Sequence, residues 1–334
     1  MKFVTFEKEG EIAPGVLTEV GDILDLKRAS RHFGKPAFTD MISVIAAGSA
    51  GIEAIRDWLR SAPASCSVRM ANVRLKAPLP RPNQIRDFAN YELHVRQAIA
   101  SSLKLRANAT PDPAATLAKF HASGLDVIPQ IWFDQPLYFK GNPMSVIGPD
   151  EDVVWPSYAK LMDYELELAV VVTGPVRDLT RENAADAIFG YTIFNDFSAR
   201  DAQSRETQFR LGPAKGKDFD TGNAIGPVIV TRDEIPDPNA LTMIARVNGE
   251  ERVRTHSGGM QHSVIDTLVH VSQSETLYPG DLFGLGTVGN GCGYESLTFL
   301  NEGDLVELEI EGIGKLRNRL VRRTPASSAP KNAS

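Results

Sequence analysis

A stretch of alternating acidic and apolar residues, Asp163-Tyr-Glu-Leu-Glu-Leu-Ala-Val-Val-Val172, constrains the fold most. Its β-branched and leucine residues predict a buried strand, in which side chains two positions apart point to the same face. Glu165 and Glu167 therefore share one face, about 7 Å apart along the strand. Leu166 and Leu168 occupy the other face. Two carboxylates in an apolar strand carry a large desolvation cost and repel each other unless a cation lies between them.

This strand has two interpretations. A hard divalent cation such as Mg²⁺ or Ca²⁺ would neutralise both acids, because these ions prefer oxygen ligands. In the alternative, the acidic face is exposed, and both acids are solvated or paired with lysine and arginine. A single Glu-x-Glu motif does not decide between them.

The composition excludes several classes of protein. The 334 residues are 42% hydrophobic and 23% charged, which is typical of a soluble globular protein. The net charge is −6 and there is no basic stripe, so nucleic acid is not an expected partner. No apolar run reaches the ~20 residues that span a bilayer, and the N-terminus does not resemble a signal peptide. Cys66 and Cys292 have no metal-binding spacing, so we expect a reduced, cytoplasmic protein without disulfides.

The chain is expected to form two domains and a tail. Residues 1–78 contain short strand patterns with Gly-rich turns and a helix near Ile52–Leu59, which predict a small β-rich N-terminal domain. Residues 79–323 contain many strands and few long helices. They predict a mainly β or α+β catalytic domain and argue against a doubly wound nucleotide fold. Residues 324–334 are rich in Ser, Ala, Pro and Asn and are predicted to be a disordered tail.

Local patterns within the larger domain predict individual elements. Thr180 is expected to cap a short helix over residues 181–189. Residues 102–125, interrupted by Pro111 and Pro113, are expected to form a mobile crossing or lid. Strands are predicted over 190–196, 225–231, 241–247 and 305–310, and a helix over 264–271.

Further residues can complete a site for a metal and for proton transfer. Asp196 ends a predicted strand, and it can join Asp87 in adding oxygen ligands to the two glutamates. His94 follows Asp87 by seven residues and is the candidate general base, although a single histidine is more often a helix cap or a buried structural ring. The sequence has no clustered Cys or His, which argues against zinc.

Two Gly-rich loops can supply groups that bind anions. Lys217 can pair with Asp218 or Asp220 at the surface, which is the usual role of such a lysine, or it can hold an anionic substrate oxygen. The loop around Thr287 can offer backbone N–H groups for the same purpose. The Gly spacing matches neither the dinucleotide fingerprint nor the P-loop.

Seven stretches, in order over residues 80–320, together resemble the fumarylacetoacetate hydrolase family, and specifically its longer, fumarylacetoacetase-like branch. The stretches are Asp87-Phe-x-x-x-x-x-His94, Asp163-Tyr-Glu-Leu-Glu-Leu168, Asn195-Asp-Phe-Ser-Ala-Arg-Asp-x-Gln203, Gly212-Pro-Ala-Lys-Gly-Lys-Asp-Phe219, Val247-Asn-Gly-Glu250, Pro279-Gly-Asp281 and Gly286-Thr287. The resemblance implies a mixed β-roll catalytic domain and a divalent cation, Mg²⁺, Ca²⁺ or Mn²⁺. It also implies a homodimer and a small diketo acid substrate from aromatic-compound catabolism.

The resemblance implies a role for each matching residue. The cation ligands are Asp87, Glu165, Glu167 and Asp196. His94 matches the histidine that activates water, and Glu295 matches the acid that orients it. The residues near the substrate and its developing oxyanion are Arg200, Gln203 and Lys217, with Tyr138 and Thr287 in the substrate-facing region. Arg200 could instead pair with Asp201 in a structural role.

Two departures from other members favour this type of site. Short acylpyruvase-like and decarboxylase-like members carry a glutamate three residues after the histidine, where this chain has Gln97. Those members also lack the acid found here at Asp87. Both differences favour a hydrolase-type site in which Glu295 is the partner of His94.

The implied activity is hydrolysis of a carbon–carbon bond in a β-diketone or acylpyruvate-like acid. His94 would activate water, and the cation would stabilise the enolate that leaves. One alternative is a metal-dependent lyase or isomerase, such as a decarboxylase, hydratase or dienoate isomerase, that uses the same enolate. A second alternative is a non-catalytic, metal-dependent binding protein.

Overall fold

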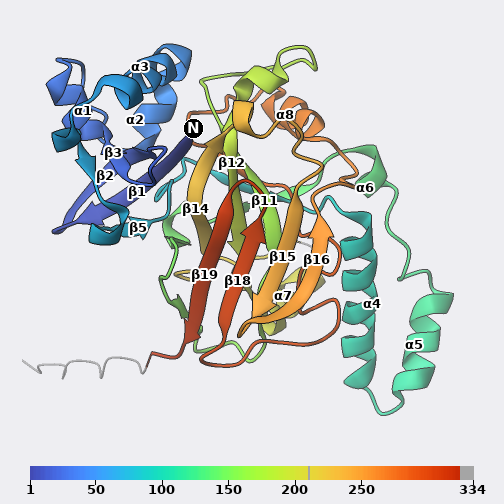
Figure 1. The fold of residues 1–334 in the computed structure, drawn as a ribbon. Coiled ribbons are helices and arrows are strands. Elements are labelled where there is room, and N and C mark those ends of the chain that lie inside the picture. Colours follow the sequence, from blue (N-terminus) through green and yellow to red (C-terminus); the bar gives the residue numbers. More distant parts are fainter. Residues whose placement is uncertain (210, 324–334) are drawn as a thin grey trace, which may run out of the picture.

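Two β-sheets form the centre of the computed structural model, which describes residues 1–209 and 211–323 (Figure 1). The larger sheet contains β1 (Lys2–Lys8), β2 (Glu11–Leu17), β3 (Ile23–Asp25), β4 (Ser67–Val68), β5 (Arg74–Lys76), β6 (Ile85–Phe88), β7 (Tyr138–Gly141), β8 (Val146–Ile147), β11 (Leu166–Val172), β12 (Ile188–Asp196), β14 (Asn223–Thr231) and β17 (Leu282–Gly284). The order is β4-β3-β2-β1-β14-β12-β11-β17-β6-β7, with β5 beside β1 and β8 beside β14. The predicted tail, 324–334, lies outside the described residues.

The smaller sheet packs against one face of the larger one. Its strands are β9 (Val153–Val154), β15 (Thr242–Val247), β16 (Glu250–His256), β18 (Leu305–Ile310) and β19 (Gly314–Val321), in the order β16-β15-β18-β19-β9. Strands β10 (Met162–Asp163) and β13 (Ser198–Ala199) form a separate pair. Leu166, Leu168 and Val170 of β11 share a core with Met243 and Leu308 of the smaller sheet. The apolar face predicted for this strand is therefore confirmed.

Helices cover the rest of the larger sheet and one side of the molecule. They are α1 (Leu26–His32), α2 (Met41–Ala46), α3 (Gly48–Ser61), α4 (Glu92–Asn108), α5 (Pro113–Ala122), α6 (Ile131–Asp134), α7 (Arg200–Glu206) and α8 (Val264–Ser272). Helices α4 and α5 form a hairpin at the edge of the molecule (Figure 1). Within residues 1–209 and 211–323, no helix combines the length and the hydropathy needed to cross a bilayer.

The N-terminal segment is continuous with the larger sheet. Strand β1 pairs with β14 through Lys2↔Val230 and Phe3↔Ile229. Helices α1–α3 add Leu26, Met41 and Ile55 to a core that also contains Val171 of β11. The mainly β or α+β fold class is confirmed, and the domain boundary at residue 78 stays a prediction.

One local prediction was wrong, and a second missed the helices that its segment forms. The helix expected over residues 181–189 is only a 3₁₀ turn, Ala184–Ala187, because Ile188 already pairs with Val172 in the sheet. The mobile crossing expected over residues 102–125 is the hairpin of α4 and α5. Its prolines do not prevent helix formation, because Pro113 occupies the first turn of α5 behind the N-cap Asp112.

Candidate active site

Four buried carboxylates converge at one end of the central strands. Asp87 lies on β6, Glu167 lies on β11 and Asp196 ends β12. Glu165 immediately precedes β11 and forms a bridge with Cys292. One oxygen each from Asp87, Glu165 and Glu167 lie within 4.8 Å of one another. The structure therefore brings together the acids that the sequence predicted as a cation site.

The local structure fits a divalent cation. Oδ1 of Asp87 and Oδ1 of Asp196 are buried and have no hydrogen-bond partner among the described residues. Gly284 leaves space between two of the acids, because a Cβ there would lie 2.7 Å from Oδ1 of Asp87 and 2.9 Å from Oε2 of Glu167. Unpaired carboxylate oxygens around an open space are suitable ligands for Mg²⁺, Mn²⁺ or Ca²⁺.

We expect Gly284→Ala to weaken cation binding by at least about tenfold, because the new methyl group would enter the space between Asp87 and Glu167. Calorimetric titration with Mn²⁺ would measure the change. Gly141→Ala on β7 is the matched control, since its Cβ would contact only the side chains of Ile85 and Asn223. If the two variants bind Mn²⁺ with equal affinity, the cation does not occupy the space between Asp87 and Glu167.

The electrostatics of the cluster also favour a cation. Burial, followed by the charge of Glu165, raises the pKa of Glu167 to about 8. Burial raises the pKa of Asp196 to about 6, and burial together with Glu167 raises the pKa of Asp87. Burial also opposes ionisation of Glu165, but Arg200 and Lys217 hold the pKa of Glu165 below its usual range. Glu167 therefore holds a proton at neutral pH unless a cation replaces it.

Cation-induced stabilisation is expected to grow as the pH rises. The raised pKa values of Asp196 and Glu167 contribute stability at low pH, and that stability is lost as the pH rises through about 6 and then about 8. A bound cation favours the charged forms and offsets this loss. Thermal unfolding with Mg²⁺ or with a chelator would test this, and at about 100 times Kd the cation would add about 2.7 kcal/mol. If the increase in melting temperature caused by Mg²⁺ becomes smaller as the pH rises, the expected direction of this effect is wrong.

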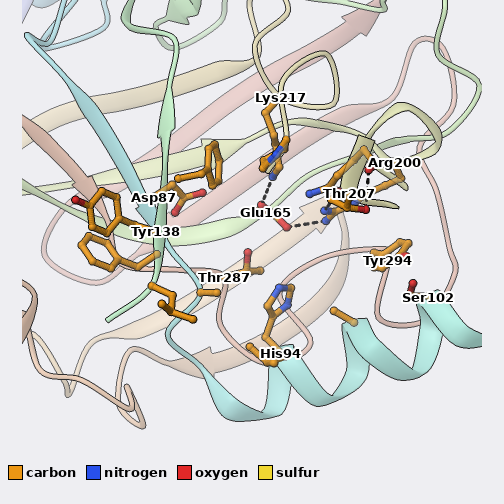
Figure 2. Close-up of a pocket in the computed structure, with 18 of the residues that line it drawn as sticks. Asp87, His94, Ser102, Tyr138, Glu165, Arg200, Thr207, Lys217, Thr287 and Tyr294 are labelled. Carbon is orange, nitrogen blue, oxygen red and sulfur yellow. Dashed lines mark hydrogen bonds and ion pairs between the residues drawn. The ribbon is translucent and has the colours of Figure 1, made fainter. Parts of the chain in front are cut away.

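Lys217 and Arg200 are paired with the acids of the cluster. Lys217 Nζ lies 2.5 Å from Oε2 of Glu165 (Figure 2). It also contacts Oδ2 of Asp196. Arg200 Nη2 donates to Oε1 of Glu165 at 2.7 Å, and Nη1 donates to Oε1 of Gln203 at 3.0 Å. The surface pairing considered for Lys217 is wrong, because this side chain is buried.

Asp163 holds this part of the site together, and sequence reasoning missed that role. Its carboxylate is fully buried and accepts the Nε–H of Arg200 at 2.9 Å, so the pairing of Arg200 with Asp201 is wrong. The same carboxylate accepts the backbone N–H groups of Gly293 and Tyr294, both at 2.8 Å. Asp163 thus fixes the loop that carries Glu295. The quoted motif begins with Asp163, but its partners lie 37 (Arg200), 130 (Gly293) and 131 (Tyr294) positions away and could not be read from spacing.

His94 and Glu295 form the predicted pair. His94 Nδ1 lies 2.8 Å from Oε1 of Glu295, whose other oxygen accepts the backbone N–H of Cys292 at 3.1 Å. An ionised carboxylate only accepts, so Nδ1 carries the proton and Nε2 has a free lone pair. Gln97 is turned away and bonds Asn290 at 2.7 Å. The structure therefore agrees with Glu295, and not residue 97, as the partner of His94.

One cavity of about 480 Å³ is lined by His94 and by three of the four acids, Asp87, Glu165 and Glu167. His94 projects into it from α4, opposite Glu165 and Lys217 (Figure 2). Thr287 also lines it, but its hydroxyl donates to Oε1 of Glu167 at 3.0 Å and so holds a proposed ligand. Tyr138 lines the wall on the side of Asp87 (Figure 2). The remaining wall is largely apolar and includes Phe88, Val95, Ile99, Leu137 and Phe139.

Comparisons with known proteins cover most of the chain. Residues 84–321 match the family model described as the C-terminal domain of fumarylacetoacetate (FAA) hydrolase. The oxaloacetate tautomerase YisK of Bacillus subtilis is 30% identical, over 96% of this chain and 100% of the relative. Human mitochondrial oxaloacetate tautomerase FAHD2A is 37% identical, over 56% of this chain and 59% of the relative. The structure of the fumarylacetoacetate hydrolase from Exiguobacterium antarcticum aligns with a TM-score of 0.71 at 28% identity, covering 97% and 100% of the two chains.

Proposed function

Because the chain belongs to the fumarylacetoacetate hydrolase family, we propose that it is a divalent-cation-dependent enzyme that interconverts the keto and enol forms of a small 2-oxo acid. Oxaloacetate is the first candidate substrate, since the B. subtilis relative with that activity in its name aligns with 96% of the chain. The observation that carries the proposal is the placement of His94 and the carboxylate cluster in one cavity. A cation held by Asp87, Glu165, Glu167 and Asp196 would act as a Lewis acid on the carbonyl oxygen and stabilise enolate charge.

His94 is the group that moves the carbon-bound proton. Glu295 accepts a hydrogen bond from Nδ1–H at 2.8 Å, so the lone pair of the neutral imidazole lies on Nε2, on the side of the cavity. In the keto-to-enol direction, Nε2 takes a proton from the carbon beside the carbonyl, and the carbonyl oxygen gains a proton from solvent. Nε2 then releases its proton to solvent, which regenerates the base. In the reverse direction, Nε2 takes a proton from solvent and returns it to the carbon, and the enol oxygen loses its proton to solvent. Only C–H and O–H bonds change and no water is consumed, so this chemistry needs a base but no hydrolytic nucleophile.

The pairing of the cationic residues supports tautomerisation over the hydrolysis predicted first. Hydrolysis needs donors for a tetrahedral oxyanion, and the resemblance assigned Arg200, Gln203 and Lys217 to that role. Arg200 instead donates to Asp163, Glu165 and the side-chain oxygen of Gln203. Lys217 donates to Glu165 and Asp196. Arg200 is thus engaged by protein groups through Nε, Nη1 and Nη2, and this engagement favours tautomerisation. Lys217 is paired with two of the proposed cation ligands.

Hydrolytic cleavage of a β-diketo acid is the second candidate. The His94–Glu295 pair favours it, because a histidine held in this way could activate water equally well. The structural relative from E. antarcticum is itself described as a fumarylacetoacetate hydrolase. The fumarylacetoacetase-like branch, the role in aromatic catabolism, the homodimer and the cytoplasmic location stay predictions.

Proton exchange and oxygen labelling distinguish the two activities. With Mg²⁺ or Mn²⁺, the protein is expected to accelerate loss of the ultraviolet absorbance of enol-oxaloacetate and to exchange deuterium into the carbon beside the carbonyl. A chelator should abolish both effects. In H₂¹⁸O, a hydrolase acting on a diketo acid would place label in a new carboxylate. If the protein does not accelerate tautomerisation over the protein-free rate but does place ¹⁸O in a new carboxylate of a diketo acid, we conclude that it is a hydrolase and not a tautomerase.

A further inference from the structure

Cys292 lies beside the His94–Glu295 pair and takes no part in the proposed proton transfer. Its Sγ is 3.9 Å from Nδ1 of His94, although the two residues are 198 positions apart. The side chains of Cys292 and Glu295 are both buried. One donor atom each from His94, Cys292 and Glu295 lie within 4.8 Å of one another.

We propose that His94, Cys292 and Glu295 form a second metal site, which binds Zn²⁺ and inhibits the enzyme. Imidazole, thiolate and carboxylate are the ligand types that zinc prefers, and three protein ligands plus water make a common shell. The carboxylate cluster offers only oxygen, so the two sites are suited to different ions. The argument against zinc from sequence spacing fails here, because the fold brings distant ligands together.

The ion needs only small movements of these side chains. Zinc bonds of about 2.1 Å to N or O and about 2.3 Å to S place tetrahedral ligands N and S about 3.6 Å apart, and N and O about 3.4 Å apart. The present separations are 3.9 Å for His94 Nδ1 to Cys292 Sγ and 2.8 Å for His94 Nδ1 to Glu295 Oε1. The thiol would therefore approach by about 0.3 Å and the carboxylate would withdraw by about 0.6 Å.

A separate cavity gives access to this site. Cys292 and Glu295 line a cavity of about 520 Å³, whereas His94 lines the one that contains the carboxylate cluster. Asn248, Asn290 and Asn301 also line the second cavity, which is polar enough to hold water. Zinc and its water ligand can thus enter without displacing a substrate.

Zinc would inhibit the enzyme by changing the tautomer of the His94 imidazole, so that Nε2 and not Nδ1 carries the proton. In the free protein, Nδ1 carries the proton and Nε2 accepts one. When the lone pair of Nδ1 binds zinc, Nε2 must carry the remaining proton of a neutral imidazole. Nε2 can then no longer take a proton from substrate. This inhibition rests on the proposed role of His94, whereas the binding of zinc does not.

Spectroscopy tests the binding of the metal without using activity. With the carboxylate cluster saturated by Mg²⁺, Co²⁺ is expected to give a thiolate-to-metal charge-transfer band. Zn²⁺ should bind with a stoichiometry of one and displace the Co²⁺. Cys292→Ser should remove the band and weaken zinc binding at least tenfold. Cys66→Ser is the matched control, because Cys66 is the other buried cysteine and lies in the N-terminal core. A band that survives Cys292→Ser would overturn the site.

Kinetics test the inhibition, with each variant compared with its own zinc-free rate. Zn²⁺ is expected to lower kcat with little change in KM, and Cys292→Ser should need at least tenfold more zinc. If the cobalt band follows Cys292 but zinc leaves turnover unchanged, the inhibition and the role of His94 as the base are both wrong. If the protein has no activity toward oxaloacetate, the cobalt band still decides whether the site exists.

Discussion

Replacing His94 with asparagine is expected to lower kcat by about 10²–10⁴, the usual contribution of a positioned general base. The asparagine amide can still donate to Glu295, but it cannot accept a proton as Nε2 does. Cation binding should persist, because His94 lies across the cavity from the carboxylate cluster (Figure 2). Deuterium exchange beside the carbonyl would measure the first effect, and Mn²⁺ calorimetry the second.

His121→Asn is the matched control for this variant. His121 also forms a histidine–carboxylate pair, with Nδ1 2.9 Å from Asp126, but it is exposed and does not line the cavity. Its replacement should leave the rate within twofold. If His94→Asn also retains a rate within threefold of the unmodified protein, another group is the base.

Replacing Glu167 with glutamine is expected to remove both cation binding and turnover. The loss of one buried ionic ligand should cost about 2–5 kcal/mol of binding free energy, or roughly 30-fold or more in Kd. In the variant, the amide oxygen can accept from Gly286 N–H and the amide NH₂ can donate to the Thr287 hydroxyl, so the variant is expected to keep its fold. Calorimetry with Mn²⁺ and the ketonisation rate would measure the two losses.

The stability of the cation-free variant provides an independent check. The pKa of Glu167 is raised to about 8, so ionisation of this acid opposes folding above that pH. Cation-free Glu167→Gln should therefore be at least as stable as the unmodified protein above pH 8.

Glu309→Gln, on β18 of the smaller sheet, is the control for the binding measurement and should leave cation affinity unchanged. A large loss of stability in cation-free Glu167→Gln would mean that Glu167 has a structural role.

Short-range patterns predicted the strands well and the connections poorly. The strand over residues 305–310 matches β18, and the helix over 264–271 ends one residue short of α8. These elements show regular apolar spacing. The helical hairpin of α4 and α5 was missed because Pro113 was taken as a break, whereas it occupies the first turn of a helix.

The convergence of residues that are far apart in the sequence could not be predicted from their spacing along the chain. The Glu165–Glu167 alternation suggested a cation, and Asp87 and Asp196 were candidate further ligands, but a solvated acidic face remained an equal alternative until the family resemblance favoured the cation. Asp163 and Cys292 act through partners more than a hundred positions away. Such contacts depend on sheet order, which no local motif contains. The hydrogen bonds of Arg200 to Asp163 and Glu165 were missed for the same reason. The preference for tautomerisation depends on those bonds, so it was missed as well.

An anomalous difference map from a crystal soaked in Mn²⁺ would test the central claim most directly. We expect a single strong peak between the carboxylates of Asp87, Glu165, Glu167 and Asp196, with the imidazole of His94 facing it across the cavity. A peak elsewhere, or acids turned away from one another with no ion among them, would contradict the metal-dependent mechanism.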